Sequence, residues 1–251
     1  MSKKKLISAY SYGLFIFLMI LAFSTALIPF LLSHLWSKKP RIYFQKIVQQ
    51  YFRLFYKLMP LLGKVTVINR EIANKYHPCI YVSTHQSSMD YTLLSTIIDD
   101  YTVTSNHPIS DFFLFMKFPK NGLGIYYIPK GELNLAQIAY EKLKEALRLN
   151  SSIILFPEGT RNPTTQLKKF KGGAFRLAIE GGVPVVPIII NGTGSIVTKG
   201  SNITKTLDKK NVEITFLEPI YPHNDEKFMQ FAKRVQLIIQ KHIDKKIDEQ
   251  I

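Results

Sequence analysis

Two hydrophobic patterns divide the chain. Residues Leu14–Leu32 are nearly all apolar, with mild interruptions at Ser24, Thr25 and Pro29, whereas the chain after residue 62 alternates short apolar runs with amphipathic stretches. About twenty apolar residues are enough to cross the hydrocarbon core of a bilayer. A cleaved signal peptide has a shorter apolar region and a small-residue cleavage site, so we predict that this segment is a retained membrane anchor.

The charges around this anchor give no clear orientation. Basic residues lie on both sides of it, namely Lys3, Lys4 and Lys5 before it and Lys38, Lys39 and Arg41 after it. The positive-inside rule therefore favours neither direction. A re-entrant hairpin, bent near Pro29 with both ends on the cytoplasmic side, explains this symmetry better than a simple span. We expect a membrane protein whose remaining domain faces the cytoplasm (at the inner membrane of the cell, if it is bacterial).

The next segment, Arg41–Leu62, has the pattern of an amphipathic helix. Its apolar positions fall on one broad face, made of Phe44, Val48, Tyr51, Phe55 and Leu58. Basic residues lie among them at helical spacing, namely Lys46, Arg53 and Lys57. Such a helix can lie in the headgroup layer of a membrane. It can equally be a core helix packed on the following domain, and the two interpretations are compatible.

The rest of the chain predicts an α/β domain. Short runs rich in β-branched and aromatic residues indicate strands at Val65–Val67, Ile80–Val82, Gly124–Ile128, Ser152–Phe156, Val183–Ile190 and Val212–Phe216. Helical patterns lie between and after them, at Asp90–Ile98, Leu133–Leu149, Phe170–Glu180 and Phe228–Ile243. This alternation predicts a mixed, largely buried sheet flanked by helices. We assign residues 1–62 to membrane-anchoring helices and residues 63–251 to one catalytic domain.

Composition narrows the possible partners. Lysine and arginine exceed the acidic residues by 33 to 18, which gives a net charge of +15. Such an excess suits nucleic acid, or an anionic membrane surface and phosphorylated ligands, and it also occurs as solvated lysine alone. No nucleic-acid-reading motif accompanies the charge, so we expect no nucleic-acid partner. Cys79 is the only cysteine and the histidines lack ligand spacing, so neither a disulfide nor a metal site is predicted.

The first candidate for chemistry is the segment Thr84–Asp90, which follows an apolar strand. Histidine is suited to remove a proton from a hydroxyl, and a carboxylate on its other ring nitrogen fixes the tautomer. Five positions along one regular helix would place His85 and Asp90 on different faces. The pair can meet if His85 lies in the loop, Ser87 or Ser88 caps a helix, and Asp90 lies in its first turn. A surface loop with a capping acid is the simpler alternative.

The second candidate is the run Ile153–Arg161, a buried strand that leads into a turn bearing an acid and an arginine. Gly159 permits a sharp turn, and Arg161 offers a planar fork of donors that matches a phosphate. By itself, this turn could equally be a structural corner held by a salt bridge between Glu158 and Arg161.

Together the two clusters resemble the glycerolipid (lysophospholipid) acyltransferase family, whose central member is 1-acyl-sn-glycerol-3-phosphate acyltransferase. The resemblance rests on the spacing of His85 and Asp90 and on the hexapeptide Phe156–Arg161, F-P-E-G-T-R. The segments Gly124–Lys130 and Val183–Pro187 resemble the second and fourth motifs of the same family. These motifs cover residues from about 80 to 192, and the N-terminal region is also typical of such membrane enzymes.

The resemblance implies a role for each matched residue. His85 is the expected general base and Asp90 orients it. The expected acceptor site is formed by Glu158, Gly159, Thr160 and Arg161, with Arg161 on a phosphate and with Gly124 and Lys130 in the same phosphate pocket. Pro184 and Pro187 are expected to shape the strand and wall beside the acyl donor.

This sequence departs from the family pattern at two places. The second motif ends in Pro129 and Lys130, where an aspartate and an arginine are usual, and lysine lacks the bidentate fork. Thr84 stands where asparagine commonly precedes the histidine. These departures leave the chemistry intact but weaken the inference to one acceptor.

Other motifs carry less weight. The basic segment Lys168–Gly173 can bind the phosphopantetheine of a donor at a helix start, or it can be a solvated loop. Asn191–Gly194 lacks the third glycine of a dinucleotide fingerprint, so we interpret it as a turn. No G-x-S-x-G elbow is present, which disfavours an acyl-serine intermediate.

The expected reaction is therefore direct acyl transfer from acyl-CoA or acyl-carrier protein to the free hydroxyl of lysophosphatidic acid, without a bound cofactor. Another lysophospholipid or glycolipid acceptor is the main enzymatic alternative. The main alternative of another class is a non-catalytic protein that binds lipid at the membrane surface.

Overall fold

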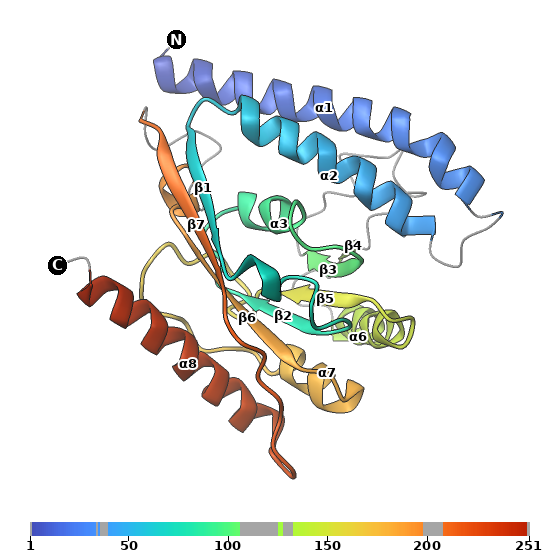
Figure 1. Ribbon diagram of the computed structural model, residues 1–251, viewed down its shortest axis with the longest axis vertical. Coiled ribbons are helices and arrows are strands. Elements are labelled where there is room, and N and C mark those ends of the chain that lie inside the picture. The colour runs from blue at the N-terminus through green and yellow to red at the C-terminus, as the bar shows by residue number, and fades with distance from the viewer. Residues whose placement is uncertain are drawn as a thin grey trace.

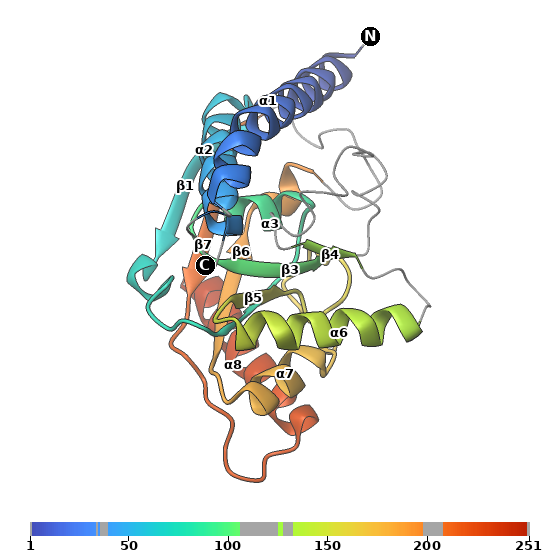
Figure 2. The same ribbon diagram turned by 90° about the vertical axis from the view of Figure 1, so that its right-hand side faces the viewer.

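The structure, a computed structural model, describes residues 2–33, 35, 40–105, 125–127, 133–197 and 208–249. These residues form three layers, with a twisted sheet between two layers of helices (Figure 1). Helices α1, α2 and α3 lie over one face of the sheet and helices α6, α7 and α8 over the other (Figure 2). The predicted class, a mixed sheet flanked by helices, is confirmed.

The elements follow one another in a largely alternating order. The helices are α1 (Lys3–Ser33), α2 (Pro40–Leu58), α3 (Met89–Leu94), α6 (Leu133–Arg148), α7 (Gly173–Gly181) and α8 (Phe228–Asp248), with short 3-10 turns η1 (Arg70–Ile72) and η3 (Thr193–Ser195). The strands are β1 (Leu62–Ile68), β2 (Ile80–Ser83), β3 (Tyr101–Ser105), β4 (Ile125–Tyr127), β5 (Ser152–Leu155), β6 (Val185–Asn191) and β7 (Lys210–Phe216).

The sheet has seven strands in the order β1-β7-β6-β2-β5-β3-β4. Neighbouring strands from β6 to β4 are parallel, whereas β7 pairs antiparallel with β6 and parallel with β1. The hydrophobic pattern did not predict β3, because hydroxyl residues surround its single aliphatic residue, Val103. Thr102 is nevertheless fully buried, since its hydroxyl lies within hydrogen-bonding distance of the Ser151 hydroxyl.

Alternation along the central strands builds a separate core on each face of the sheet. Tyr81, Ile154 and Val186 pack into the core shared with α1, α2 and α3. The residues directly before the first two, Ile80 and Ile153, pack into the core shared with α6, α7 and α8. Successive side chains of a strand point to opposite faces, so a sheet with helices on both sides needs apolar residues at nearly every position. This requirement explains the continuous apolar runs in the sequence.

Helix α2 is a core helix. Phe44, Val48 and Phe55 of its predicted apolar face are buried in the core next to the sheet. Its polar side chains are used as well, because Gln45 and Gln49 donate to the carbonyls of Tyr101 and Ile98 at 2.8 and 2.9 Å. The predicted boundary after residue 62 also needs correction, since β1 begins at Leu62 and α2 shares the core of the catalytic sheet.

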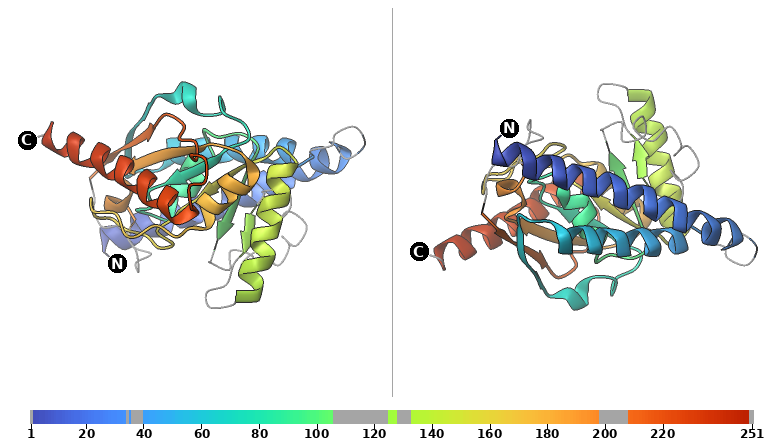
Figure 3. Two further views of the ribbon diagram at one scale, coloured as in Figure 1. Left: turned by 90° about the horizontal axis from the view of Figure 1, so that it is seen from below. Right: turned by 90° about the horizontal axis from the view of Figure 1, so that it is seen from above.

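Helix α1 packs along α2, and Figure 3 shows the two side by side when seen from above. Aromatic rings join them, as Phe15 stacks on Phe52 and Phe30 meets Phe44 edge-on, with centroids 6.3 and 5.6 Å apart. The helix continues through Pro29 to Ser33, so the predicted bend near Pro29 is wrong. Helix α2 then runs antiparallel to α1, since Phe15 meets Phe52 while Phe30 meets Phe44.

The outer side of α1 is apolar. Large hydrophobic side chains are exposed along it, namely Leu6, Phe17, Ile20, Leu21, Leu27, Ile28, Leu31 and Leu32. Among the described residues, α1 is the one helix long and apolar enough to cross a membrane. An apolar surface of this length on a folded domain is typical of a membrane or partner interface.

Two truncations should separate the roles of α1 and α2. Removing residues 1–33 should release the chain from membranes while detergent-solubilised protein still melts cooperatively. Removing residues 1–62 should abolish cooperative melting, because the buried rings of α2 contribute about 1.5–3 kcal/mol each against a total stability of about 5–15 kcal/mol. Sedimentation in high salt measures membrane attachment of each variant, and thermal melting measures its cooperative unfolding. The assignment fails if the first variant stays on membranes, or if the second melts like the full chain.

Candidate active site

Three loops meet at one edge of the sheet. The strands β2, β5 and β6 are adjacent and parallel, so the loops that follow them all leave from the same edge. His85 lies in the loop after β2, and the turn with Glu158 and Arg161 follows β5. The loop from Asn191 into η3 follows β6. Strand order therefore brings together residues that are more than a hundred positions apart.

His85 and Asp90 form the predicted pair. The Nδ1 atom of His85 lies 2.8 Å from Oδ2 of Asp90. The Asp90 carboxylate is completely buried, whereas the imidazole is 20% exposed. The His85 ring stacks on Phe156 with the centroids 4.2 Å apart, which fixes its plane. Because Nδ1 donates to the carboxylate, Nε2 is the nitrogen that can accept a proton.

The start of α3 uses one of the two predicted serines. Ser88 is the N-cap residue, but its side chain makes no capping hydrogen bond, whereas the Ser87 hydroxyl accepts the backbone N–H of Met89 at 3.4 Å. Asp90 also turns back, and its Oδ2 accepts the backbone N–H groups of Gln86 and Ser87 at 2.7 and 2.8 Å. The loop that holds His85 is therefore wrapped around the same carboxylate that orients it.

Helix α2 also supports this loop. Burial raises the pKa of the Tyr56 hydroxyl well above its usual value, so the phenol stays protonated. Tyr56 donates to the carbonyl of Met89 at 3.1 Å, directly next to Asp90. The position of the first turn of α3 thus depends on α2.

Glu158 stabilises the turn that follows β5. Its side chain is 6% exposed, and Oε2 accepts from Nδ2 of Asn162 at 2.7 Å and from the backbone of Lys168 at 3.0 Å. Its Oε1 atom is buried without a hydrogen-bond partner among the described residues. The backbone N–H of Asn162 donates to the carbonyl of His85, which joins the turn after β5 to the loop after β2.

Arg161 and Glu158 form no ion pair within the described part of the chain, so the alternative of a salt-bridged corner is wrong. Arg161 is half-buried. Burial raises the pKa of the Tyr12 hydroxyl on α1, and the positive charge of Arg161 lowers it, so the arginine lies in the neighbourhood of this helix.

Gly159 makes the turn possible. Its φ of 65° is in the left-handed region that favours glycine. A Cβ at this position would lie 2.6 Å from Nζ of Lys171, so the lysine side chain passes directly over the turn. Lys171 also donates its backbone N–H to the carbonyl of Pro157 at 2.8 Å. Thr160, between Gly159 and Arg161, is half-buried.

The loop after β6 completes the site. Thr193 donates from its hydroxyl to Oδ1 of Asp90 at 2.6 Å. Oε1 of Gln86 accepts the backbone N–H of Gly192 at 3.0 Å, and Oγ1 of Thr84 accepts that of Ile190 at 2.8 Å. The segment interpreted as a simple turn is thus hydrogen-bonded to the loop of His85.

The remaining predicted residues lie elsewhere. Pro184 precedes β6 and accepts the N–H of Ile80, so it stands at the opposite edge of the sheet from His85. Pro187 pairs in register with Val82 inside the sheet. Gly124 and Lys130 lie outside the described residues, and only Ile125–Tyr127 of their segment is placed, as β4.

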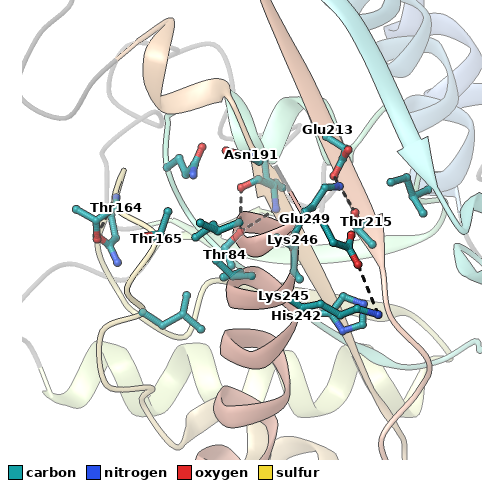
Figure 4. A pocket seen from close by; sticks show the side chains of 18 of the residues that line it. Thr84, Thr164, Thr165, Asn191, Glu213, Thr215, His242, Lys245, Lys246 and Glu249 are labelled. Carbon is teal, nitrogen blue, oxygen red and sulfur yellow. Dashed lines mark hydrogen bonds and ion pairs between the residues drawn. The ribbon is translucent and has the colours of Figure 1, made fainter. Parts of the chain in front are cut away.

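A cavity of about 250 Å³ lies behind the catalytic loop. Glu158, Gln86 and Thr84 line it, but His85 and Arg161 do not. Figure 4 shows side chains that α8, β6 and β7 contribute, including the ion pair between Lys246 and Glu213. Glu158 and Gln86 thus border the same cavity.

The arrangement is suited to proton transfer from a hydroxyl beside an anionic group. A partly exposed histidine with a buried carboxylate partner has the arrangement of an oriented general base. Arg161, on the turn joined to it, supplies positive charge nearby. Sequence reasoning missed Thr193, Gln86 and Asn162, because their role depends on contacts made across the folded loops.

Comparisons with known proteins agree on one family. Residues 64–191 match the Acyltransferase family. The chain is 36% identical over 146 residues to a chloroplastic 1-acyl-sn-glycerol-3-phosphate acyltransferase of Brassica napus, a match of 57% of this chain and 41% of that protein. It is 31% identical over 193 residues to the 1-acyl-sn-glycerol-3-phosphate acyltransferase of Saccharomyces cerevisiae, covering 73% of this chain and 62% of the yeast protein. The matched region thus spans less than two thirds of these relatives.

The fold has a solved counterpart. The crystal structure of the 1-acyl-sn-glycerophosphate acyltransferase from Thermotoga maritima superimposes with a TM-score of 0.69 at 22% identity. The superposition covers 97% of both chains, and therefore includes the N-terminal helices.

Two glycines with positive φ allow a matched test of the loop after β6. Gly192 has a φ of 101°, and a Cβ there would lie 2.2 Å from the carbonyl oxygen of Asn211. Gly182 has a φ of 62° with open space around it. Gly182→Ala should cost about 1–2 kcal/mol from the backbone alone, and Gly192→Ala about 1–3 kcal/mol more from overpacking. Equal losses of stability in chemical denaturation would contradict the close approach.

Proposed function

Because this chain belongs to the acyltransferase family, we propose that it transfers a fatty acyl group from a thioester to the free hydroxyl of 1-acyl-sn-glycerol-3-phosphate, lysophosphatidic acid. The observation that carries this proposal is the hydrogen-bonded pair of His85 and Asp90, in a loop that is itself hydrogen-bonded to the turn that bears Arg161. The names of the relatives support the same acceptor. Acyl-CoA or acyl-carrier protein is the proposed donor, and no bound cofactor takes part.

The reaction proceeds by direct transfer. Nε2 of His85 removes the proton from the acceptor hydroxyl while the hydroxyl oxygen attacks the carbonyl carbon of the thioester. The tetrahedral intermediate then collapses, the C–S bond breaks, and the proton on His85 passes to the departing thiolate. Asp90 stabilises the imidazolium that exists between these two steps.

The backbone limits where the oxyanion can be stabilised. The N–H groups of Gln86 and Ser87 already donate to Asp90, so they are committed to the carboxylate. The oxyanion must therefore be stabilised by donors other than these two N–H groups.

Arg161 is the proposed ligand of the acceptor phosphate. A guanidinium can meet a phosphate with two parallel hydrogen bonds, which a lysine cannot do. Glu158 is buried and holds the turn through Asn162 and Lys168, so its proposed part in the acceptor site is to position Arg161. Another lysophospholipid or glycolipid acceptor remains the competing proposal, and it predicts no preference for a phosphate monoester.

The acceptor reaches this site from the membrane. The exposed apolar face of α1 is the proposed lipid contact, and the net charge of +15 favours an anionic surface. Because α1 lies along α2 and α2 is part of the core, the helix pair attaches the domain with its site close to the lipid. We place the catalytic domain on the cytoplasmic side. A purely lipid-binding role is disfavoured, since binding needs no aligned base.

Two histidines make a matched test of the general base. His85→Ala should reduce turnover by roughly two to four orders of magnitude, the usual range for a positioned base. His77 also lies near an acid, with Nε2 3.6 Å from Asp100, but it precedes β2 at the opposite edge of the sheet. His77→Ala should lose thermal stability and keep its turnover. Full activity of the His85 variant would refute the assignment.

The acceptor can be tested with Arg161→Lys. The variant should raise the Michaelis constant for lysophosphatidic acid roughly tenfold or more, because a charge-assisted contact is lost. The Michaelis constant for the donor should change far less. Activity on a lysolipid with a substituted head group should fall less than activity on lysophosphatidic acid.

Glu158→Ala is the companion variant, because it loosens the turn without removing the guanidinium. It should lower thermal stability and reduce activity on both acceptors by the same factor. If Arg161→Lys also reduces activity on lysophosphatidic acid and on the substituted lysolipid by the same factor, Arg161 does not bind the phosphate and does not select the acceptor.

A further inference from the structure

The two oxygens of the Asp90 carboxylate have different surroundings. Oδ2 accepts three N–H groups, from Nδ1 of His85 and from the backbone of Gln86 and Ser87, at 2.7–2.8 Å. Oδ1 accepts the Thr193 hydroxyl at 2.6 Å. Within the described part of the chain, this hydroxyl is its one donor. Both side chains are completely buried, so no bulk water can replace it.

A bond to Oδ1 fixes the plane of the carboxylate. The three donors on Oδ2 hold that atom, but they restrain rotation about the bond from Cβ to Cγ less than contacts on both oxygens do. The orientation of His85 depends on this plane, because its Nδ1–H must point at a lone pair of Oδ2. A donor on Oδ1 therefore acts on the base through the carboxylate.

Thr193 is held firmly enough to do this. It lies in η3, and backbone hydrogen bonds run from the preceding residues, Gly192 and Ile190, to the side chains of Gln86 and Thr84. Ser87 closes the other side, since its hydroxyl donates to the carbonyl of Val197 at 2.8 Å. The loop after β6 and the loop of His85 are thus joined before and after Thr193.

We propose that Thr193 is a positioning residue of the reaction, which holds the Asp90 carboxylate in the plane that orients His85. The inference rests on the proposed function, because it assigns Thr193 to the same proton transfer. The proton-transfer site is then a hydrogen-bonded series of three side chains, Thr193, Asp90 and His85, from two loops. Thr193 touches neither the substrate nor the reacting atoms.

The hydroxyl of Thr193 affects the protonation of His85 through the Asp90 carboxylate. A carboxylate that loses one donor accepts more strongly at its remaining bonds, so it holds a protonated imidazole more tightly. Without the hydroxyl, His85 should therefore stay protonated to higher pH. A general base works only when deprotonated, so the acid limb of the pH profile of kcat/KM should move to higher pH.

The experiment compares three variants of the full chain in detergent. Thr193→Val keeps the shape and removes the hydroxyl, and Thr193→Ser keeps the hydroxyl. Thr102→Val is the structural control, because Thr102 is equally buried but lies in β3, away from the site. Each variant is assayed with acyl-CoA and lysophosphatidic acid across a pH series, and its melting temperature is measured.

Thr193→Val should lose roughly ten- to a hundredfold in kcat, as expected for a hydrogen bond to a charged group, and its acid limb should shift upward. Thr193→Ser should keep the kcat and the acid limb of the native chain. Thr102→Val should lose stability with an unshifted profile.

A Thr193→Val variant with the profile of the native chain overturns the proposal, whether or not it loses stability. The proposed function itself fails in a different way, because the native chain would then transfer no acyl group to any lysolipid offered.

Discussion

The Asp90 carboxylate is buried completely, and a buried charge is tolerated only where hydrogen bonds replace its water. Its donors come from the loop after β2 and from η3 after β6. Satisfying this one group therefore requires both loops to be in place at once. His85, whose exposed nitrogen carries the proposed chemistry, is oriented as a consequence. The sheet order makes this possible, since β2 lies directly beside β6.

The same loop is supported from the other side by α2. Tyr56 contacts the first turn of α3, and Gln45 and Gln49 hold the carbonyls of the segment that leads into β3. Helix α1 in turn packs on α2 through aromatic rings. A continuous series of contacts thus links the apolar surface of the protein to the carboxylate. The loop of His85 and the apolar helix α1 therefore belong to one packed unit.

Local sequence predicted what local physics determines. The apolar runs gave the central strands, and the five-residue spacing of His85 and Asp90 gave a pair that the structure confirms. Contacts between distant segments escaped prediction. Thr193 lies 103 positions after Asp90, and nothing near it in the sequence indicates a carboxylate. Gln45 and Gln49 resemble a solvated helix face, yet both are buried because they bond to main-chain carbonyls. A hairpin bend was predicted near Pro29, but α1 continues through it.

The packing of α1 against α2 has a thermodynamic consequence. The exposed side of α1 is apolar along most of its length, so we expect amphiphiles to bind the folded chain there. The paired surface exists only in the native state, so lipid or detergent acts as a ligand that binds the native state in preference to the unfolded one. By mass action, such a ligand raises the free energy of unfolding as its concentration rises. The melting temperature of this protein is therefore a property of the protein together with its amphiphile, and values measured in different detergents are not comparable.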